Sequence, residues 1–116
     1  MQLMTGEQAI LLASQPVDFR NSIDGLACIV QEQLGCKPSE GVFIFYNRAR
    51  NRVKILLWHH NGFIVLYKRF EQGKLTITKT TDNKVTLSIE QLNWLLMGVD
   101  WLTLYGANKN IFENYY

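Results

Sequence analysis

The chain has 116 residues, of which 47% are hydrophobic and 19% charged, with a formal net charge of +2. This composition excludes a disordered chain, and the length predicts one domain over residues 1–116 with a single modest core. The charge is uneven: residues 48–79 contain eight basic residues and one acidic residue, or +7, which leaves −5 elsewhere and is typical of proteins that bind a polyanion.

The N-terminal segment predicts neither a secretion signal nor a membrane anchor. MQLMTGEQAILLASQP has no basic beginning, and its apolar run covers only residues 9–13. That run is too short for the core of a signal peptide or for a membrane span, so we expect a cytoplasmic protein without membrane contact. The same run, which Ser14 to Pro16 end, is typical of a buried strand, although one turn of helix also fits.

An amphipathic helix is predicted over residues 21–34. Asn21 or Ser22 can cap its N-terminus, and Gly35 can end it. Its apolar residues recur at steps of three and four and form one stripe: Ile23, Leu26, Ala27, Val30 and Leu34.

Cys28 and Cys36 lie eight residues apart and form no metal-binding pair. Cys28 falls within the helical pattern, where we expect a small buried side chain. A disulfide between the two is the weaker alternative, because nothing else in the sequence indicates an oxidising compartment.

Three runs rich in β-branched and aromatic residues predict an antiparallel meander over residues 42–47, 53–58 and 63–69. The turn-like segments RARNR and HHNG separate them, and Asn61-Gly62 is a hairpin signal. We therefore expect an α+β fold with a small, mainly antiparallel β-meander sheet and two packed helices.

The second helix is predicted to begin at Ser88, which forms a capping-box pattern with Gln91. A turn and a short strand over residues 75–78 are expected before it. The apolar tail over residues 102–116 can pack on the sheet or on another chain. The buried stripe of this helix is expected to consist of Ile89, Leu92, Leu95, Leu96 and Val99.

Four basic residues occupy every second position around the first turn of the meander: Arg48, Arg50, Arg52 and Lys54. If this stretch is extended, all four point to one side, in a row that Leu56 and Trp58 continue. The opposite row then faces the core and contains Val53, Ile55 and Leu57. If the turn curls instead, the basic side chains spread around its tip.

Either geometry displays these side chains where they can contact the phosphates of a nucleic acid, and Lys68 and Arg69 can extend the same patch. The alternative is a solvated hairpin tip whose charges discourage aggregation. The interleaved aromatic residues can stack on unpaired bases or, more commonly, pack across strands in the core: Tyr46, Trp58, Phe63 and Tyr67.

No pattern in the chain predicts catalysis, a metal or a cofactor. His59 and His60 are neighbours without a further set of ligands, so we expect exposed turn residues. Asp18 and Asp24 could be read as a catalytic pair, but pairing with Arg20 and helix capping explain them better. We therefore expect a non-enzyme.

Four blocks of the sequence occur in a familiar order and spacing: PVDFRNSIDGLACIVQEQL, GVFIFYNRARNRVKILLW, NGFIVLYKRFEQGKL and QLNWLLMGVDW. Together they resemble the TnpB accessory proteins of the IS66 family of bacterial insertion sequences, which are distinct from the RNA-guided nuclease that shares that name. The resemblance covers about residues 16–101. It implies a role in transposition beside a separate transposase, to which the strand-cutting chemistry is assigned.

The resemblance leaves the molecular task open, and the basic segment favours DNA, expected as a duplex at the element termini. The predicted binding residues are Arg48, Arg50, Arg52, Lys54, Lys68 and Arg69, with Arg20 as a weaker candidate. The alternative is a protein-interaction module that docks on the transposase without contacting DNA. Self-association into a homo-oligomer is also left open.

Overall fold

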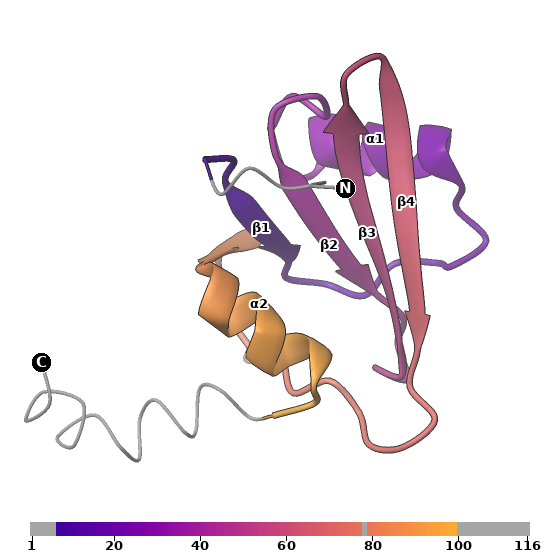
Figure 1. Cartoon of the computed structure of the whole chain (residues 1–116), viewed down its shortest axis with the longest axis vertical. Helices are drawn as coiled ribbons and strands as arrows, with labels where there is room; N and C mark the ends of the chain where they lie inside the picture. Colours follow the sequence, from indigo (N-terminus) through magenta and orange to yellow (C-terminus); the bar gives the residue numbers. More distant parts are fainter. Residues whose placement is uncertain (1–6, 78, 100–116) are drawn as a thin grey trace, which may run out of the picture.

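The computed structural model describes residues 7–77 and 79–99, which form a five-stranded sheet with a helix on each face (Figure 1). The helices are α1 (Ile23–Glu32) and α2 (Ile89–Leu96). In sheet order the strands are β4 (Gly62–Arg69), β3 (Arg52–His59), β2 (Val42–Tyr46), β1 (Ile10–Ala13) and β5 (Lys84–Leu87). The predicted α+β fold with a mainly antiparallel sheet and two packed helices is confirmed.

The predicted meander is also confirmed, since β2, β3 and β4 pair antiparallel to one another. The turn between β3 and β4 lies at His60 and Asn61. β1 pairs parallel with β2, with Leu11 opposite Phe43, and α1 makes the crossover between them. The carboxyl ends of β1 and β2 therefore lie at the same edge of the sheet, where the β2–β3 loop begins.

The central strands β1 and β2 are buried on both faces, because each face of the sheet carries a helix. Alternate strand residues face α1, and these include Leu11, Phe43, Phe45 and Leu56. The opposite set packs against Leu92 and Leu95 of α2, and it includes the predicted core row Val53, Ile55 and Leu57. Burial on both faces explains why the strands read as continuous apolar runs rather than as alternating ones.

The capping box predicted at the start of α2 is present. The Ser88 hydroxyl accepts from the backbone N–H of Gln91 at 3.1 Å, and the Gln91 side-chain oxygen accepts from the Ser88 N–H at 2.8 Å. α1 has Ser22 at its N-cap position, without a side-chain bond. Gly35 follows α1 with a φ of +65°, which suits a glycine that ends a helix.

The predicted burial of Cys28 is wrong, because its side chain is exposed. The buried residues of α1 are Leu26 and Val30, and a residue midway between them on a helix points to the opposite side. Ile23 and Ile89 begin their helices and are also exposed, at 37% and 45%. Both cysteines are free, and neither helix of the described ranges is long and apolar enough to cross a membrane.

The predicted strand over residues 75–78 is wrong for the described residues Leu75–Ile77, which belong to no strand. The sequence analysis instead missed β5, a four-residue strand that pairs antiparallel with β1. Such a short edge strand carries little pattern of its own, and its partner decides its conformation. The tail over residues 102–116 lies outside the described residues.

Candidate nucleic-acid interface

The β2–β3 loop, residues 47–51, is a tight turn closed by Asn47. The Asn47 side-chain oxygen accepts from the backbone N–H groups of Asn51 and Arg52, both at 3.0 Å. The Arg50 N–H donates to the Asn47 carbonyl at 2.9 Å, and Arg50 has a φ of +60°. The extended arrangement of Arg48 to Lys54 is therefore wrong, and the curled alternative is confirmed.

Two backbone hydrogen bonds hold the segment that follows β4 against this loop. The N–H of Phe70 donates to the Asn51 carbonyl, and the N–H of Leu75 donates to the Arg50 carbonyl, both at 2.7 Å. Leu75 is 1% exposed and anchors the segment in the core. The loop and this segment consequently lie at the same end of the sheet, the lower end in Figure 1.

Lys54, one of the predicted binding residues, directs its ammonium group toward the chain before α1. Its Nζ donates to the carbonyl of Phe19 at 2.8 Å and to that of Asn21 at 2.9 Å. It also lies 5.0 Å from the centre of the Phe19 ring, a cation–π contact. Two of its three N–H donors are therefore used inside the protein.

Lys68 and Arg69 are also engaged within the chain. The Lys68 ammonium donates to the Leu96 carbonyl at the end of α2 and lies 4.6 Å from the centre of the Phe70 ring. The Arg69 guanidinium pairs with Glu71 at 2.8 Å. The register of β3 and β4 places Arg69 opposite Arg52, so two like charges are neighbours across the strands.

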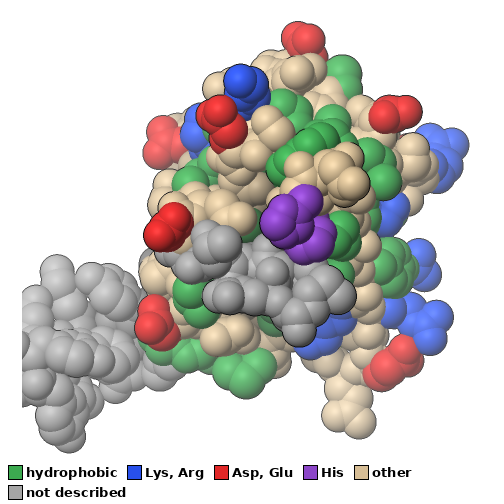
Figure 2. All heavy atoms as spheres, turned by 45° about the horizontal axis from the view of Figure 1, so that its top comes forward, with side chains coloured by type: hydrophobic (Ala, Val, Ile, Leu, Met, Phe, Trp, Pro, Cys, Tyr) green, Lys and Arg blue, Asp and Glu red, His purple; other side chains and the backbone are tan. Residues whose placement is uncertain are grey.

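Within residues 7–77 and 79–99, five basic side chains have neither a hydrogen bond nor an ion pair, and all five are exposed: Arg48, Arg50, Arg52, Lys74 and Lys79. They belong to the β2–β3 loop, the start of β3 and the segment packed against that loop. We call these five residues the basic cluster. Figure 2 shows that the basic side chains gather mostly along one side of the molecule, on the right of this view.

Basic residues elsewhere in the described part of the chain have partners. Arg20 pairs with Asp18 at 2.5 Å, and Lys37 approaches Glu40 at 3.7 Å. Lys84 donates to the carbonyl of Leu34 at 2.7 Å, where the negative end of α1 favours a cation. The positive charges that remain available to a partner molecule are thus concentrated at one end of the sheet.

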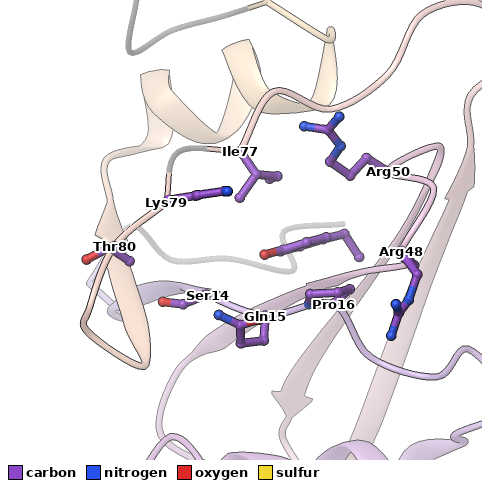
Figure 3. A pocket seen from close by; sticks show the side chains of 9 residues that line it. Ser14, Gln15, Pro16, Arg48, Arg50, Ile77, Lys79 and Thr80 are labelled. Carbon is purple, nitrogen blue, oxygen red and sulfur yellow. The ribbon is translucent and has the colours of Figure 1, made fainter.

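A pocket of about 350 Å³ opens beside the basic cluster (Figure 3). Arg48 and Arg50 lie on one side of it, and Lys79 and Thr80 lie on the opposite side. The segment that leaves β1 forms a wall, and the remaining lining comes from Tyr46 and Ile77. Sequence reasoning placed Lys74 and Lys79 in the basic segment but not in the site, because tertiary contacts such as the backbone bonds from Phe70 to Asn51 and from Leu75 to Arg50 bring their segment to the loop.

Tyr46 and Asp18, near this end, both have shifted pKa values. Burial raises the pKa of Tyr46 above its usual 10.0, although the charge of Arg50 partly opposes that shift. Tyr46 is therefore a neutral phenol at physiological pH. The side-chain hydrogen bond from Arg20 is the main cause that lowers the pKa of Asp18 from 3.8 to about 2.

The described residues contain no group of three or more side chains suited to hold a metal ion. The rings of His59 and His60 contact each other edge to face at 4.6 Å between their centres. The Asp18 carboxylate accepts hydrogen bonds from Arg20, as the sequence predicted, and does not pair with a second carboxylate. The exposed side chains of the basic cluster are therefore better suited to an anion than to a metal ion.

Comparison with known proteins places the chain among proteins of mobile elements. Residues 8–105 match the family described as IS66 Orf2 like protein. The chain is 33% identical over 93 residues to "Uncharacterized protein y4jC" of Sinorhizobium fredii (strain NBRC 101917 / NGR234), and these residues cover 79% of this chain and 80% of that protein. It is 29% identical over 93 residues to "Uncharacterized protein y4hO" of the same strain, with 79% and 81% covered. No solved structure matches the chain.

Proposed function

Because the chain belongs to the family of IS66 Orf2 like proteins, we propose that it is a non-catalytic accessory protein of insertion-sequence transposition that binds duplex DNA through its basic cluster. The DNA would include the termini of the element, and the transposase of the same element would carry out the strand cutting. The protein would act in the cytoplasm and require no cofactor.

The observation that carries this proposal is that the basic side chains without a partner inside the protein lie together in the basic cluster, whereas the other basic side chains of the described residues are bound within the chain. Arg48 and Arg50 are exposed on a turn that hydrogen bonds hold in shape, and Arg52 is exposed at the start of β3, so the three side chains are presented from a rigid base. Arginine suits this task because its planar guanidinium binds a phosphate through two parallel hydrogen bonds.

The side chains at this end favour binding over catalysis. A nucleophile or general base needs an adjacent group that activates it, and such a group has a pKa near the working pH. The pKa of Tyr46 is raised and that of Asp18 is lowered, so both move away from neutrality. We infer that the protein positions DNA for another protein.

A salt titration tests DNA binding directly. Purified protein is titrated with two labelled duplexes, an element terminus and a scrambled sequence, by fluorescence anisotropy at several salt concentrations. If the five cations of the basic cluster each contact a phosphate, the logarithm of affinity should fall with the logarithm of salt with a slope of roughly −4 to −5. Preference for the terminus would add readout of bases or of DNA shape.

Two triple variants with equal loss of charge identify the surface. Replacing Arg48, Arg50 and Arg52 with alanine should abolish tight binding and reduce the salt slope by about 3, without unfolding the protein. The control replaces Arg20, Lys37 and Arg69, each of which already pairs with a carboxylate, and should retain most of the slope. Wild-type affinity in the folded loop variant would overturn the proposal.

The second candidate function is docking on the transposase without contact to DNA, and one feature of the sheet favours it. β4 is an edge strand of eight residues, and only β3 pairs with it among the described strands. An exposed strand edge can accept an additional strand from another protein. Copurification with the transposase that survives nuclease treatment, together with no DNA binding at low salt, would favour this function.

A further inference from the structure

The pocket beside the basic cluster lies at the carboxyl ends of the parallel strands β1 and β2. Ser14, Gln15 and Pro16 leave β1 along one wall, and Tyr46 ends β2. In sheets with parallel strands joined by a helix, ligands bind in the crevice outside the carboxyl ends of those strands. The pocket thus occupies a position in the fold that suits a small bound group.

The charges around the pocket favour an anion. Among the residues that the structure describes, the lining contains the cations Arg48, Arg50 and Lys79 and no carboxylate. Figure 3 shows Lys79 extending from its side of the pocket toward the side that carries Arg50. Like charges that converge without a counterion repel one another, and a bound phosphate would remove that repulsion.

The uncharged part of the lining matches the remainder of a nucleotide. Pro16 and Ile77 provide apolar surface against which a base or sugar can pack, and Gln15 and Thr80 provide donors and acceptors for polar edges. The Ser14 hydroxyl oxygen is buried at the pocket wall and has no hydrogen-bond partner within the described part of the chain. Such an orphaned buried hydroxyl is uncommon in folded proteins.

The dimensions of the pocket decide which form of nucleic acid can enter. A volume of about 350 Å³ falls at the lower end of pockets that hold small ligands, which is enough for one nucleotide. A base-paired duplex is too wide to enter such a hollow. A nucleotide freed from pairing can enter, and the energetic cost of unpairing is least where the strand is already single.

We propose that this pocket receives one unpaired, phosphate-bearing nucleotide at the end of a DNA strand, while the exposed arginines of the loop hold the adjoining duplex. This inference rests on the proposed DNA-binding function and adds the structure of the preferred DNA. The protein would then bind DNA where a duplex meets a single-stranded end, with the single-stranded nucleotide in the pocket.

The test compares DNA ends of different structure. The wild-type protein is titrated with a hairpin duplex that has one blunt end and with the same hairpin carrying a short 5′ or 3′ single-stranded extension with a terminal phosphate. We expect about tenfold tighter binding of one of the two extended forms, the order of magnitude that contacts to a single base provide. Equal binding of all three DNAs would overturn this inference and leave the proposed function intact.

Pocket variants separate this preference from duplex binding. Gln15 is exposed at the pocket, so Gln15→Trp should fill the pocket, abolish the preference and leave blunt-duplex affinity unchanged. Gln31→Trp places the same change on an exposed position of α1 and should retain the preference. Preference retained in a folded Gln15→Trp variant would overturn the assignment to this pocket.

Free nucleotides distinguish a strand end from a small-molecule ligand. Each nucleoside monophosphate is added as a competitor against the extended hairpin. Weak competition at millimolar concentration agrees with a strand end, because the duplex contacts are then missing. A free nucleotide that binds as tightly as the extended hairpin would overturn the strand-end proposal, and a protein that binds none of the DNAs would overturn both proposals.

Discussion

The backbone N–H of Leu75 donates a 2.7 Å hydrogen bond to the backbone carbonyl of Arg50. Arg50 is exposed at the tip of the β2–β3 loop, whereas Leu75 is buried in the core against α2. One bond therefore connects the tip of the basic loop to the packed interior. It also places Lys74 beside that loop, although Lys74 and Arg50 are 24 residues apart in the sequence.

Leu75→Ala should destabilise the protein strongly. The substitution leaves a cavity beside β3 and α2, and a buried Leu→Ala change lowers the free energy of unfolding by about 2–5 kcal/mol. Urea denaturation followed by circular dichroism measures this loss. Leu75→Met keeps most of the volume and should cost less than about 1.5 kcal/mol, and equal losses in the two variants would contradict the anchoring role.

Lys54→Met tests whether this lysine positions the chain before α1 or contacts DNA. The variant loses the hydrogen bonds from Nζ to the carbonyls of Phe19 and Asn21, so we expect a loss of about 1–3 kcal/mol of unfolding free energy. The salt slope of DNA binding should stay unchanged. A slope reduced by about one with unchanged stability would assign Lys54 to a phosphate instead.

The Asp18 carboxylate should titrate in the folded protein with a pKa of about 2, because Arg20 donates hydrogen bonds to it. The folded pKa is lower than the usual value of 3.8, so the stabilisation is fully present above pH 3.8 and is lost as the pH falls toward 2. NMR titration of the side-chain carboxyl carbon measures this pKa. In Arg20→Ala it should return to the usual range for aspartate, and an unchanged pKa would exclude Arg20 as the cause.

Ser88→Ala should remove the capping box at the start of α2. The change leaves the N–H of Gln91 without its side-chain acceptor and should cost about 1 kcal/mol of unfolding free energy. Asn93→Ala changes an exposed position of the same helix and should shift stability by less than about 0.5 kcal/mol. Thermal or urea unfolding of both variants provides the comparison, and equal effects would argue against the cap.

The local elements of this protein could be predicted from the sequence because each has a strong pattern of its own. The apolar runs of β2, β3 and β4 and the capping box at Ser88 are confirmed at nearly the predicted positions. β5 was not predicted, because a four-residue edge strand depends on its partner β1. Cys28 falls within the apolar helical pattern, which predicts burial. It is exposed because the face of α1 that packs on the sheet is the one with Leu26 and Val30.

The sequence by itself determined the fold class, the family resemblance and the presence of a basic segment, since these follow from composition, periodicity and ordered blocks. Which cations remain available was decided only by the tertiary structure. A lysine's charge is the same at every position, but its ammonium is engaged wherever backbone carbonyls come within reach, as they do at Lys54 and Lys68. Lys74 and Lys79 join the loop arginines because the chain after β4 packs against the β2–β3 loop, a contact between distant residues that no local pattern encodes.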